Sequence, residues 1–304
     1  MERSDYSELY KALENICGKE YVMAVEPMSA HTTFKVGGPA ALYVIPANEE
    51  ILSQTVRACR AAGVRYYVIG NGSNLLVNDD GFDGVIIEIG RQMSDILVSD
   101  TVITAQAGAS LAMIAAKARD EGLTGFEFAS GIPGNLGGAC IMNAGAYDGQ
   151  MKDVLVSVRL MDCDGSIHEE TAEDIKLSYR YSNIPERSMI VVSAVLKLSK
   201  GDRDEITAKM KELNSRRAEK QPLEYPSAGS TFKRPEGYFA GKLIQDSGMQ
   251  GYSVGGAQVS EKHAGFVINR GGATAADIWQ LTEDVIRTVK DKTGVTLERE
   301  IKVL

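Results

Sequence analysis

The stretch Gly131–Tyr147, GIPGNLGGACIMNAGAY, places five glycines and one proline among mostly small side chains. Glycine loses more conformational freedom on ordering than any other residue, so this density disfavours a regular helix and a regular strand alike. We therefore expect an irregular loop. Amides with no Cβ beside them suit close contact with a phosphate or pyrophosphate, whereas a tight loop with one glycine buried for packing is the alternative. The number of glycines favours the ligand-binding interpretation.

A second glycine-rich turn, Gly70–Val77 (GNGSNLLV), follows a β-branched and aromatic segment that predicts a strand at 64–70. The turn lacks the Lys-Ser/Thr pair of a P-loop. It also lacks the third glycine of a dinucleotide fingerprint, and the next expected element is a strand at 84–89 where that fingerprint requires a helix. The turn is either a hairpin connection or a phosphate-binding turn. In the second case, both glycine-rich stretches face one extended ligand.

The composition is typical of a globular protein long enough for two domains: 304 residues, 44% hydrophobic and 24% charged. The net charge of −8 argues against a general affinity for nucleic acid or an anionic membrane. Four scattered cysteines form no CxxC or Cys/His pattern, which disfavours a zinc site and a disulfide framework. The sequence shows no secretion signal and no apolar run that could span a bilayer, so we expect a reduced, cytoplasmic protein.

Hydrophobic patterns and capping signals predict helices and strands without a long βαβ repeat, which indicates an α+β fold. Asn48 is a good N-cap for a helix ending at Gly63, and Ser110 for a helix running to about Asp120. A domain boundary is expected near Gly201, where a strand ends and a charged helix begins. The other expected elements are a short helix within 1–26, strands at 41–46, 101–108, 154–161, 166–169, 189–198, 266–269 and 295–304, and helices at 202–219, 240–246 and 273–294.

Arg180 and Ser230 lie in turn-like segments, SYRYS and PSAGSTFKRP, with Lys220 ahead of the second. By residue type alone, Arg180 is most often a surface charge and Ser230 a turn residue bonded to its own backbone. No GxSxG elbow surrounds Ser230, and three histidines in the chain give a Ser-His-Asp triad poor support. His263 is interpreted as a structural residue or a substrate contact. Spacing alone predicts a phosphate-bearing ligand beside a basic, serine-containing loop.

Glu298 and Glu300 stand two residues apart on the expected final strand, so they should point to the same face. A carboxylate pair on one face of a terminal strand is usually solvated. Catalysis is the less common interpretation of this spacing.

Six separated motifs occur in an order typical of one family: HTTFKVGGPA, IGNGSNLLV, GIPGNLGGACIMNAGAY, SYRYS, PSAGSTFKRP and LEREI. Over residues 29–304 the set resembles the UDP-N-acetylenolpyruvoylglucosamine reductases, flavoenzymes of bacterial cell-wall precursor synthesis. The resemblance implies a helical extension at 1–28, then a two-part FAD-binding region of the vanillyl-alcohol-oxidase-like (PCMH) type at 29–200, with subdomains of about 29–95 and 96–200. A smaller α+β substrate domain follows at 201–304. A role in peptidoglycan synthesis would link the protein to cell shape and cell division.

The resemblance assigns both glycine-rich turns to FAD, through its pyrophosphate. The implied flavin contacts are Gly70, Asn71, Gly72, Ser73, Asn74, Leu75, Gly131, Pro133, Gly134, Gly138, Asn143 and Gly145.

The implied reaction is the NADPH-dependent reduction of UDP-N-acetylglucosamine enolpyruvate to UDP-N-acetylmuramate. NADPH reduces the flavin, and hydride then passes from flavin N5 to C3 of the enolpyruvyl group. Ser230 matches the proton donor to C2, and Arg180 the group that stabilises the growing negative charge. Glu300 matches the third catalytic position, as a protonated acid or as a group that orients Arg180. The implied partners are these small molecules, with no metal, nucleic acid or membrane insertion.

Substrate contacts are implied at Arg216 and at Lys220, which could pair with the diphosphate. Arg234 and His263 are further candidates, although Arg234 stands where many relatives have Asn. The chain between Arg180 and Lys220 has no room for the long Tyr-bearing insertion of one subgroup, so the sequence resembles the second subgroup.

Two alternatives remain open at this level. The first is another FAD-dependent oxidase of the same fold, acting on a sugar or alcohol, in which His31 or Cys140 would tether the flavin. The second is a non-catalytic flavin- or nucleotide-sugar-binding protein. The joint presence of the Arg180, Ser230 and Glu300 motifs argues against the second.

Overall fold

A computed structural model describes residues 6–304, and the chain forms two compact units that are each built from separate stretches. Unit 1 comprises the chain up to Ala24, Ala41–Asn71 and Asp83–Arg216. Unit 2 comprises Val25–Ala40, Gly72–Phe82 and Arg217–Leu304. The contiguous domains expected at 29–200 and 201–304 stay a prediction. In the compact units, two short stretches from the N-terminal third of the chain group with the C-terminal residues.

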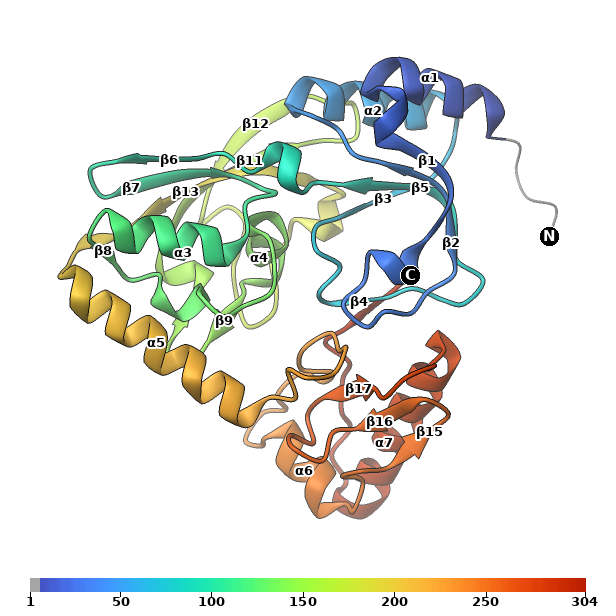
Figure 1. The fold of residues 1–304 in the computed structure, drawn as a ribbon, viewed down its shortest axis with the longest axis vertical. Coiled ribbons are helices and arrows are strands. Elements are labelled where there is room, and N and C mark those ends of the chain that lie inside the picture. The colour runs from blue at the N-terminus through green and yellow to red at the C-terminus, as the bar shows by residue number, and fades with distance from the viewer. Residues whose placement is uncertain (1–5) are drawn as a thin grey trace. The chain divides into compact units, whose positions relative to one another are not determined.

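Unit 1 contains a five-stranded antiparallel sheet in the order β12-β11-β13-β7-β6 (Figure 1). Its strands are β6 (Ile96–Ser99), β7 (Val102–Gln106), β11 (Leu155–Met161), β12 (Ile167–Thr171) and β13 (Ile190–Lys197). Ile103 and Ala105 of β7 are buried while Thr104 between them is exposed, which is the period-2 alternation of a strand with one covered face.

A second sheet, most of whose residues belong to unit 1, has the order β1-β2-β5-β3. Its strands are β1 (Val22–Pro27), β2 (Pro39–Val44), β3 (Tyr66–Ile69) and β5 (Phe82–Glu88). β3 and β5 are parallel neighbours, so their carboxyl ends reach the same edge. Val85, Ile86 and Ile87 of β5 are all buried, as in a strand covered on both faces.

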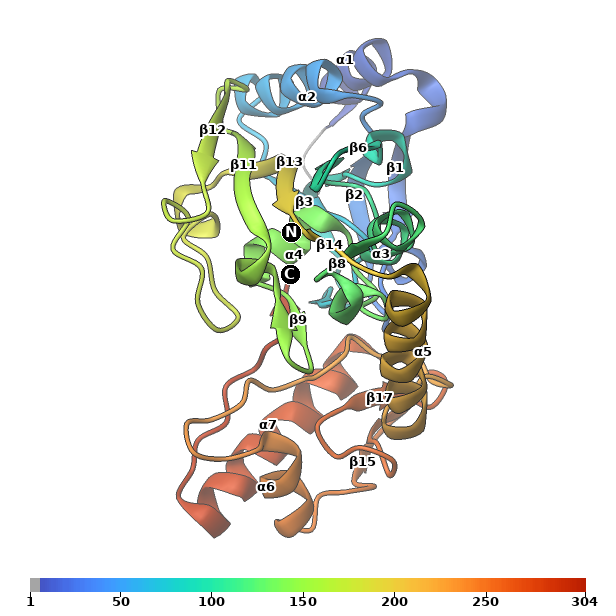
Figure 2. The same ribbon diagram turned by 90° about the vertical axis from the view of Figure 1, so that its left-hand side faces the viewer.

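Unit 1 has the helices α1 (Ser7–Cys17), α2 (Glu49–Ala61) and α3 (Leu111–Asp120). α1 lies within the range 1–26 where a short helix is expected, and α2 and α3 begin and end close to the positions that the sequence predicts. Asn48 accepts a hydrogen bond from Ile51 N at 3.0 Å, and Ser110 accepts one from Met113 N at 3.2 Å. Both predicted N-caps are therefore confirmed. α1 packs along α2, as both views of the ribbon show (Figure 1, Figure 2).

Unit 2 has a three-stranded antiparallel sheet of β15 (Ser253–Val254), β16 (Ala257–Val259) and β17 (Val267–Asn269), with helices α6 (Ala240–Asp246) and α7 (Ala275–Thr293). α7 buries Ile278, Leu281, Val285 and Val289, which recur at helical spacing and form one apolar face. Its N-terminus carries a capping box between Thr274 and Asp277.

The smaller elements complete the fold. They are α5 (Arg203–Lys220), the parallel pair β4 (Leu75–Leu76) and β18 (Lys302–Val303), the pair β8 (Leu123–Thr124) and β14 (Ser199–Lys200), the hairpin of β9 (Gly145–Ala146) and β10 (Gly149–Gln150), and six 3-10 turns at Lys19–Tyr21, Met28–Ala30, Arg91–Met93, Glu127–Ala129, Met151–Asp153 and Pro185–Arg187.

The expectation of an irregular loop throughout Gly131–Tyr147 is wrong. The stretch contains a helix, α4 (Leu136–Met142), despite two adjacent glycines. A Cβ built on Gly137 would lie 3.1 Å from Ala107 Cβ, so the glycine permits close packing of α4 on the end of β7. Tertiary packing thus overrides the low helix propensity of glycine.

The expected final strand at 295–304 is also wrong, because β18 covers only Lys302–Val303. Before it, an isolated bridge joins Arg299 to Phe232. Glu298 is exposed and Glu300 is buried, so the two carboxylates do not share a face. The period-2 rule fails here because the backbone is not a continuous strand.

Candidate active site

The start of α4 presents an open backbone amide. The amides of Leu136 and Gly137 donate to the carbonyls of Ala109 and Ala107, both at 2.9 Å, which fixes the helix on the end of β7. The next amide, that of Gly138, donates to no acceptor among residues 6–304. Gly138 is exposed, and no atom lies within 4 Å of a Cβ built on it. This glycine is therefore not explained by packing, and its surroundings fit a ligand that approaches the backbone.

Asn135, at the N-cap of α4, lies where several strands of unit 1 end. Its Nδ2 donates to Gly108 O at 2.8 Å, just after β7, and its Cβ lies 3.2 Å from a Cβ built on Gly70, just after β3. Its side-chain Oδ1 is buried without a partner in the described chain, as is Ser130 Oγ. Buried polar atoms normally have hydrogen-bond partners, so these two oxygens fit a site that binds a polar cofactor.

The second glycine-rich turn lies in unit 2 from Gly72 onward. Gly72 has a φ of +59°, and a Cβ there would lie 2.1 Å from His31 O, so no other residue fits without backbone movement. Its carbonyl accepts a hydrogen bond from Thr33 N at 3.2 Å. The amides of Gly72, Ser73 and Asn74 find no acceptor in the described part of the chain. Successive open amides of this kind form a concave anion site.

Asn143 and Gly145 have structural roles that the sequence did not reveal. Asn143 ends α4 in the left-handed region with φ 42°, and it is 2% exposed. Its amide nitrogen donates to Gln150 Oε1 and Ser178 O, and its Oδ1 accepts from Lys152 N. A Cβ on Gly145 would lie 2.7 Å from Gly149 O, so glycine is needed for the β9–β10 hairpin. The flavin contacts assigned to these two residues stay predictions.

The remaining flavin candidates of this stretch, Gly131, Pro133 and Gly134, form the turn that leads into α4. Gly134 O accepts a hydrogen bond from Leu111 N at 3.0 Å, which joins the turn to the start of α3. Pro133 is exposed, and Gly131 and Gly134 are partly exposed. These residues are accessible to a ligand.

Arg180 occupies a strained position in a tight turn of unit 1. Ser178 and Tyr181 exchange backbone hydrogen bonds of 3.1 and 3.2 Å, and Arg180 between them has a φ of 52°. A positive φ at the third residue of a turn normally calls for Gly or Asn. The arginine Nη1 lies 3.4 Å from Gly145 O, in the glycine-rich stretch. A strained arginine turned toward a ligand-binding loop is a candidate functional residue.

Ser230 and Glu300 are neighbours across paired backbone segments of unit 2. Thr231 O accepts from Glu300 N at 2.8 Å, one step along from the bridge between Phe232 and Arg299. Thr231 is fully buried, and its Oγ1 accepts from Val267 N at 2.9 Å. Ser230 is partly exposed, and its hydroxyl makes no hydrogen bond to residues 6–304. The hydroxyl is thus available to a ligand while its neighbour is anchored.

Glu300 also touches the glycine-rich turn of unit 2. Asn74 Nδ2 donates to Glu300 O at 3.1 Å, and Asn74 O accepts from Lys302 N at 2.9 Å. The turn at Gly72, the segment of Glu300 and the segment of Ser230 are therefore joined by hydrogen bonds, although they lie far apart in the sequence. In unit 1, hydrogen bonds from side chains join the motif of Arg180 to the other glycine-rich stretch.

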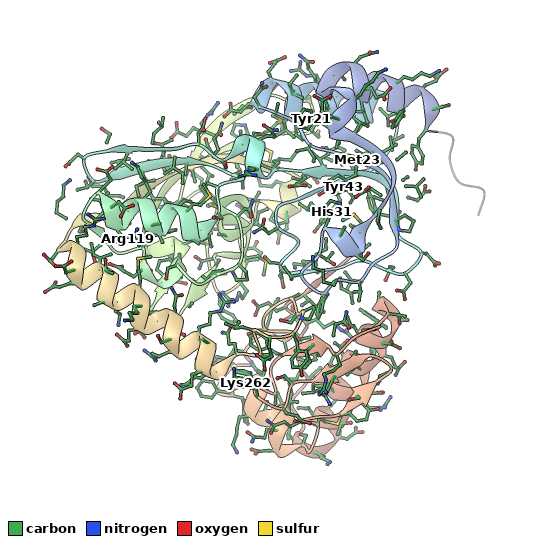
Figure 3. The ribbon with its side chains drawn as sticks, viewed as in Figure 1. Tyr21, Met23, His31, Tyr43, Arg119 and Lys262 are labelled. Atoms are coloured by element: carbon green, nitrogen blue, oxygen red, sulfur yellow. The ribbon has the colours of Figure 1, made fainter. Side chains whose placement is uncertain are left out.

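The candidate substrate contacts are less closely grouped. Arg216 and Lys220 are exposed one helical turn apart on α5, and the Arg216 guanidinium lies 4.7 Å from the centre of the Tyr147 ring. The end of α5 is held by Lys262, whose Nζ donates to Ala218 O at 2.8 Å (Figure 3). Arg234 stacks on the Phe239 ring at 4.0 Å.

His263 is held in one orientation by its own loop. Its Nδ1 accepts from Gly265 N at 3.0 Å, and its ring packs edge-on against Phe266. Burial lowers the pKa of His263, and the positive charge of Lys220 lowers it further. The neutral imidazole therefore has Nε2–H as its free donor.

The structure gives no support to a tethered flavin at Cys140. This cysteine is fully buried in α4, and burial raises the pKa of its thiol to about 12, so the nucleophilic thiolate is disfavoured. All four cysteines are free, and residues 6–304 contain no group of His, Cys, Asp and Glu side chains that could hold a metal ion. None of the helices described here is both long and apolar enough to cross a membrane.

Comparison with known proteins gives the class and the family. The chain matches the family model of an FAD-binding domain over residues 39–171, and that of the C-terminal domain of UDP-N-acetylenolpyruvoylglucosamine reductase over residues 221–304. A glucose dehydrogenase, Phl p 4.0202, shares the fold alone, with a TM-score of 0.51 at 15% identity over 64% of this chain and 44% of that one. The protein is an FAD-binding oxidoreductase of α+β architecture, and the predicted fold class is confirmed.

Closer relatives define the family. The UDP-N-acetylenolpyruvoylglucosamine reductase of Agathobacter rectalis is 53% identical over 291 residues, 92% of each chain, and that of Clostridium perfringens is 48% identical over 301 residues, 99% of each. The crystal structure of UDP-N-acetylenolpyruvylglucosamine reductase from Thermus caldophilus matches with a TM-score of 0.79 at 35% identity, over 93% of this chain and 97% of that one. The chain belongs to the UDP-N-acetylenolpyruvoylglucosamine reductase family, whose members serve peptidoglycan precursor synthesis.

The residues present fit FAD. In unit 1 the open amide of Gly138 suits a phosphate oxygen, and the unsatisfied oxygens of Ser130 and Asn135 suit hydrogen-bond donors of a cofactor. In unit 2 the successive open amides of Gly72, Ser73 and Asn74 suit a phosphate group as well. Ser130 and Asn135 were missed by the sequence analysis, because nothing in an Asn or Ser side chain marks it as unsatisfied before the fold is known.

Proposed function

We propose that this protein reduces UDP-N-acetylglucosamine enolpyruvate to UDP-N-acetylmuramate with NADPH as electron donor and bound FAD as redox cofactor. The observation that carries the proposal is the hydrogen-bonded grouping in unit 2 of the Gly72 turn, Glu300 and Ser230. A protein that only stored flavin would not need an anchored serine with an available hydroxyl next to its cofactor turn. We place the enzyme in the cytoplasm, where its nucleotide-linked substrates are found.

When bound, FAD would supply the hydride chemistry that connects NADPH to C3 of the enolpyruvyl group. Negative charge then develops at C2 and spreads into the carboxylate of the substrate. Arg180 is the proposed group that stabilises this charge, since its planar guanidinium can make two parallel hydrogen bonds to a carboxylate.

Ser230 is the proposed proton donor to C2. A serine hydroxyl is a weak acid, but the carbanion that it protonates is strongly basic, so transfer is favourable. Glu300 is proposed to act in its protonated form or to orient the groups around C2.

Lys220, Arg216, Arg234 and His263 are proposed substrate contacts. The three cations suit the diphosphate and carboxylate groups of the substrate. His263 would contribute Nε2–H as a neutral donor, because its Nδ1 is already occupied by Gly265 N. The short chain between Arg180 and Lys220 supports membership of the subgroup without the tyrosine-bearing insertion.

An anaerobic two-step titration of the purified protein tests the proposal. NADPH should bleach the flavin, and UDP-N-acetylglucosamine enolpyruvate should then restore its colour in the absence of oxygen. If only oxygen restored the colour after bleaching, the result would favour the alternative that the protein is an FAD-dependent oxidase. A protein that cannot be reconstituted with FAD would contradict the assignment of both glycine-rich turns.

A further inference from the structure

The end of α4 and the turn that carries Arg180 are held together at three points. Asn143 Nδ2 donates to Ser178 O at 3.0 Å, and Ser182 Oγ donates to Ile141 O at 2.8 Å. The third contact is that of Arg180 Nη1 with Gly145 O at 3.4 Å. All three join residues 141–145 to residues 178–182, more than thirty positions later in the chain.

The turn needs this support because its backbone is strained. Arg180 has a φ of 52°, in the left-handed region that a residue with a Cβ enters only at an energetic cost. A strained residue keeps such a conformation only where its surroundings hold it there. At the start of the turn, Asn143 Nδ2 donates to the carbonyl of Ser178. Just after the turn, the hydroxyl of Ser182 donates to Ile141 O.

Asn143 has no polar atom left for a ligand. Both amide hydrogens go to Gln150 Oε1 and Ser178 O, its Oδ1 accepts from Lys152 N, and the residue is 2% exposed. Asn also tolerates the left-handed conformation that ends α4. The side chain therefore meets two requirements at once: it ends the helix and holds the turn.

We propose that Asn143 is a positioning residue for Arg180, and that α4 makes the glycine-rich stretch and the catalytic guanidinium one rigid element. This inference rests on the proposed function, in which Arg180 stabilises negative charge on the substrate. It differs from the implied role of Asn143 as a flavin contact.

Asn143→Gly is the decisive variant, because glycine keeps the left-handed helix end and removes only the side-chain hydrogen bonds. The matched control is Asn48→Gly, which removes an Asn side chain and its hydrogen bond at the N-cap of α2 in the same unit. Asn143→Gly should slow flavin reoxidation by substrate about 10- to 100-fold, the range expected when a catalytic group is misplaced by about an ångström. Flavin reduction by NADPH and the Kd for FAD should stay close to wild type in both variants.

A double-mutant cycle identifies the residue through which Asn143 acts. In an Arg180→Ala background, Asn143→Gly should slow reoxidation no further, because the group that it positions is gone. Equal slowing in both backgrounds would overturn the proposal. So would an Asn143→Gly protein with a raised Kd for FAD but normal reoxidation once loaded, which would make Asn143 a flavin contact. Ser182→Ala, which removes the second tie, should repeat the effect in weaker form if Asn143→Gly does not fold.

Amide hydrogen exchange keeps the test independent of the substrate. The FAD-bound protein with Asn143→Gly should exchange faster over residues 177–182 than wild type, while Asn48→Gly should not. Unchanged exchange there would overturn the proposal even if the titration above showed a different substrate. If the anaerobic titration failed but Asn143→Gly exchanged faster over residues 177–182, only the proposed function would be overturned. The role of Asn143 in holding the turn would stand.

Discussion

The two units each join a glycine-rich stretch to a candidate catalytic residue, but they do so with different groups. In unit 1, side chains make the connection: Asn143 holds Ser178 O, and Arg180 reaches Gly145 O. In unit 2, backbone atoms make most of it: Glu300 N bonds Thr231 O, and Lys302 N bonds Asn74 O. One side-chain bond, from Asn74 to Glu300 O, is added to the backbone pairing.

The difference indicates which candidate catalytic residue depends on the side chains of its neighbours. A backbone ladder survives most substitutions, because every residue except proline can make it. A connection through side chains depends on residue identity at a few positions. We therefore expect the placement of Arg180 to be lost by substitutions at neighbouring residues, and the placement of Ser230 to resist them.

Ser230→Ala should give the largest effect. Loss of the proposed proton donor should slow flavin reoxidation by substrate by a factor of about 10²–10⁴, the usual contribution of a general acid. Flavin reduction by NADPH should be nearly unchanged, because Ser230 takes no part in it. Stopped-flow absorbance of the two half-reactions measures this directly, with Ser230→Cys as the variant that keeps a proton donor and part of the activity. Equal slowing of both halves would remove Ser230 from the mechanism.

Gly138→Ala separates packing from ligand binding in unit 1. Nothing lies within 4 Å of the new Cβ, and alanine favours a helix by about 1 kcal/mol over glycine, so the apoprotein should be as stable or more stable. The Kd for FAD should rise about tenfold or more, which corresponds to roughly 1.4 kcal/mol, because the methyl group stands beside the open amide. Apoprotein thermal unfolding and fluorescence titration with FAD check the two parts. Unchanged FAD affinity would show that the cofactor does not approach this amide.

Thr231→Val tests whether the placement of Ser230 in unit 2 is kept when a neighbouring side chain is substituted. The substitution leaves the buried amide of Val267 without its acceptor, which should lower the free energy of unfolding by about 1–3 kcal/mol. The backbone bond from Glu300 N to Thr231 O remains, so reoxidation per folded molecule should stay near wild type. Urea unfolding and stopped-flow kinetics on the same preparation give both values. Kinetic loss as large as in Asn143→Gly would mean that the two units do not differ in this respect.

His263→Gln should give the smallest effect on stability, seen as a change in the pH dependence of unfolding. The folded pKa of His263 lies below its ordinary value of 6.5, because of burial and then of Lys220. The unfolded chain therefore binds a proton more readily, so stability falls as pH drops from about 6.5 through the lower folded pKa. Urea unfolding from pH 8 to 5 gives the free energy of unfolding of wild type and of His263→Gln. The difference between the two should fall as the pH drops. A difference that stays constant with pH would contradict it.

Much of the fold was predictable from local patterns. The caps at Asn48 and Ser110 and the helix at 273–294 follow from short-range chemistry and hydrophobic spacing, and they appear within a residue or two of their expected positions. The helix inside Gly131–Tyr147 was not predictable in this way. Its stability comes from packing against Ala107, a residue outside the stretch.

In the candidate site, too, some features follow from the sequence and others only from the tertiary structure. The sequence by itself determined the residue types and their order, and so the family, the cofactor and the candidates Arg180, Ser230 and Glu300. Only the tertiary structure decided that Asn143 bonds Ser178 and that Glu300 is buried while Glu298 is exposed. It also decided that the oxygens of Ser130 and Asn135 are left for a ligand. Residue type and order are written along the chain, whereas burial and hydrogen-bond satisfaction belong to pairs of groups that folding brings together.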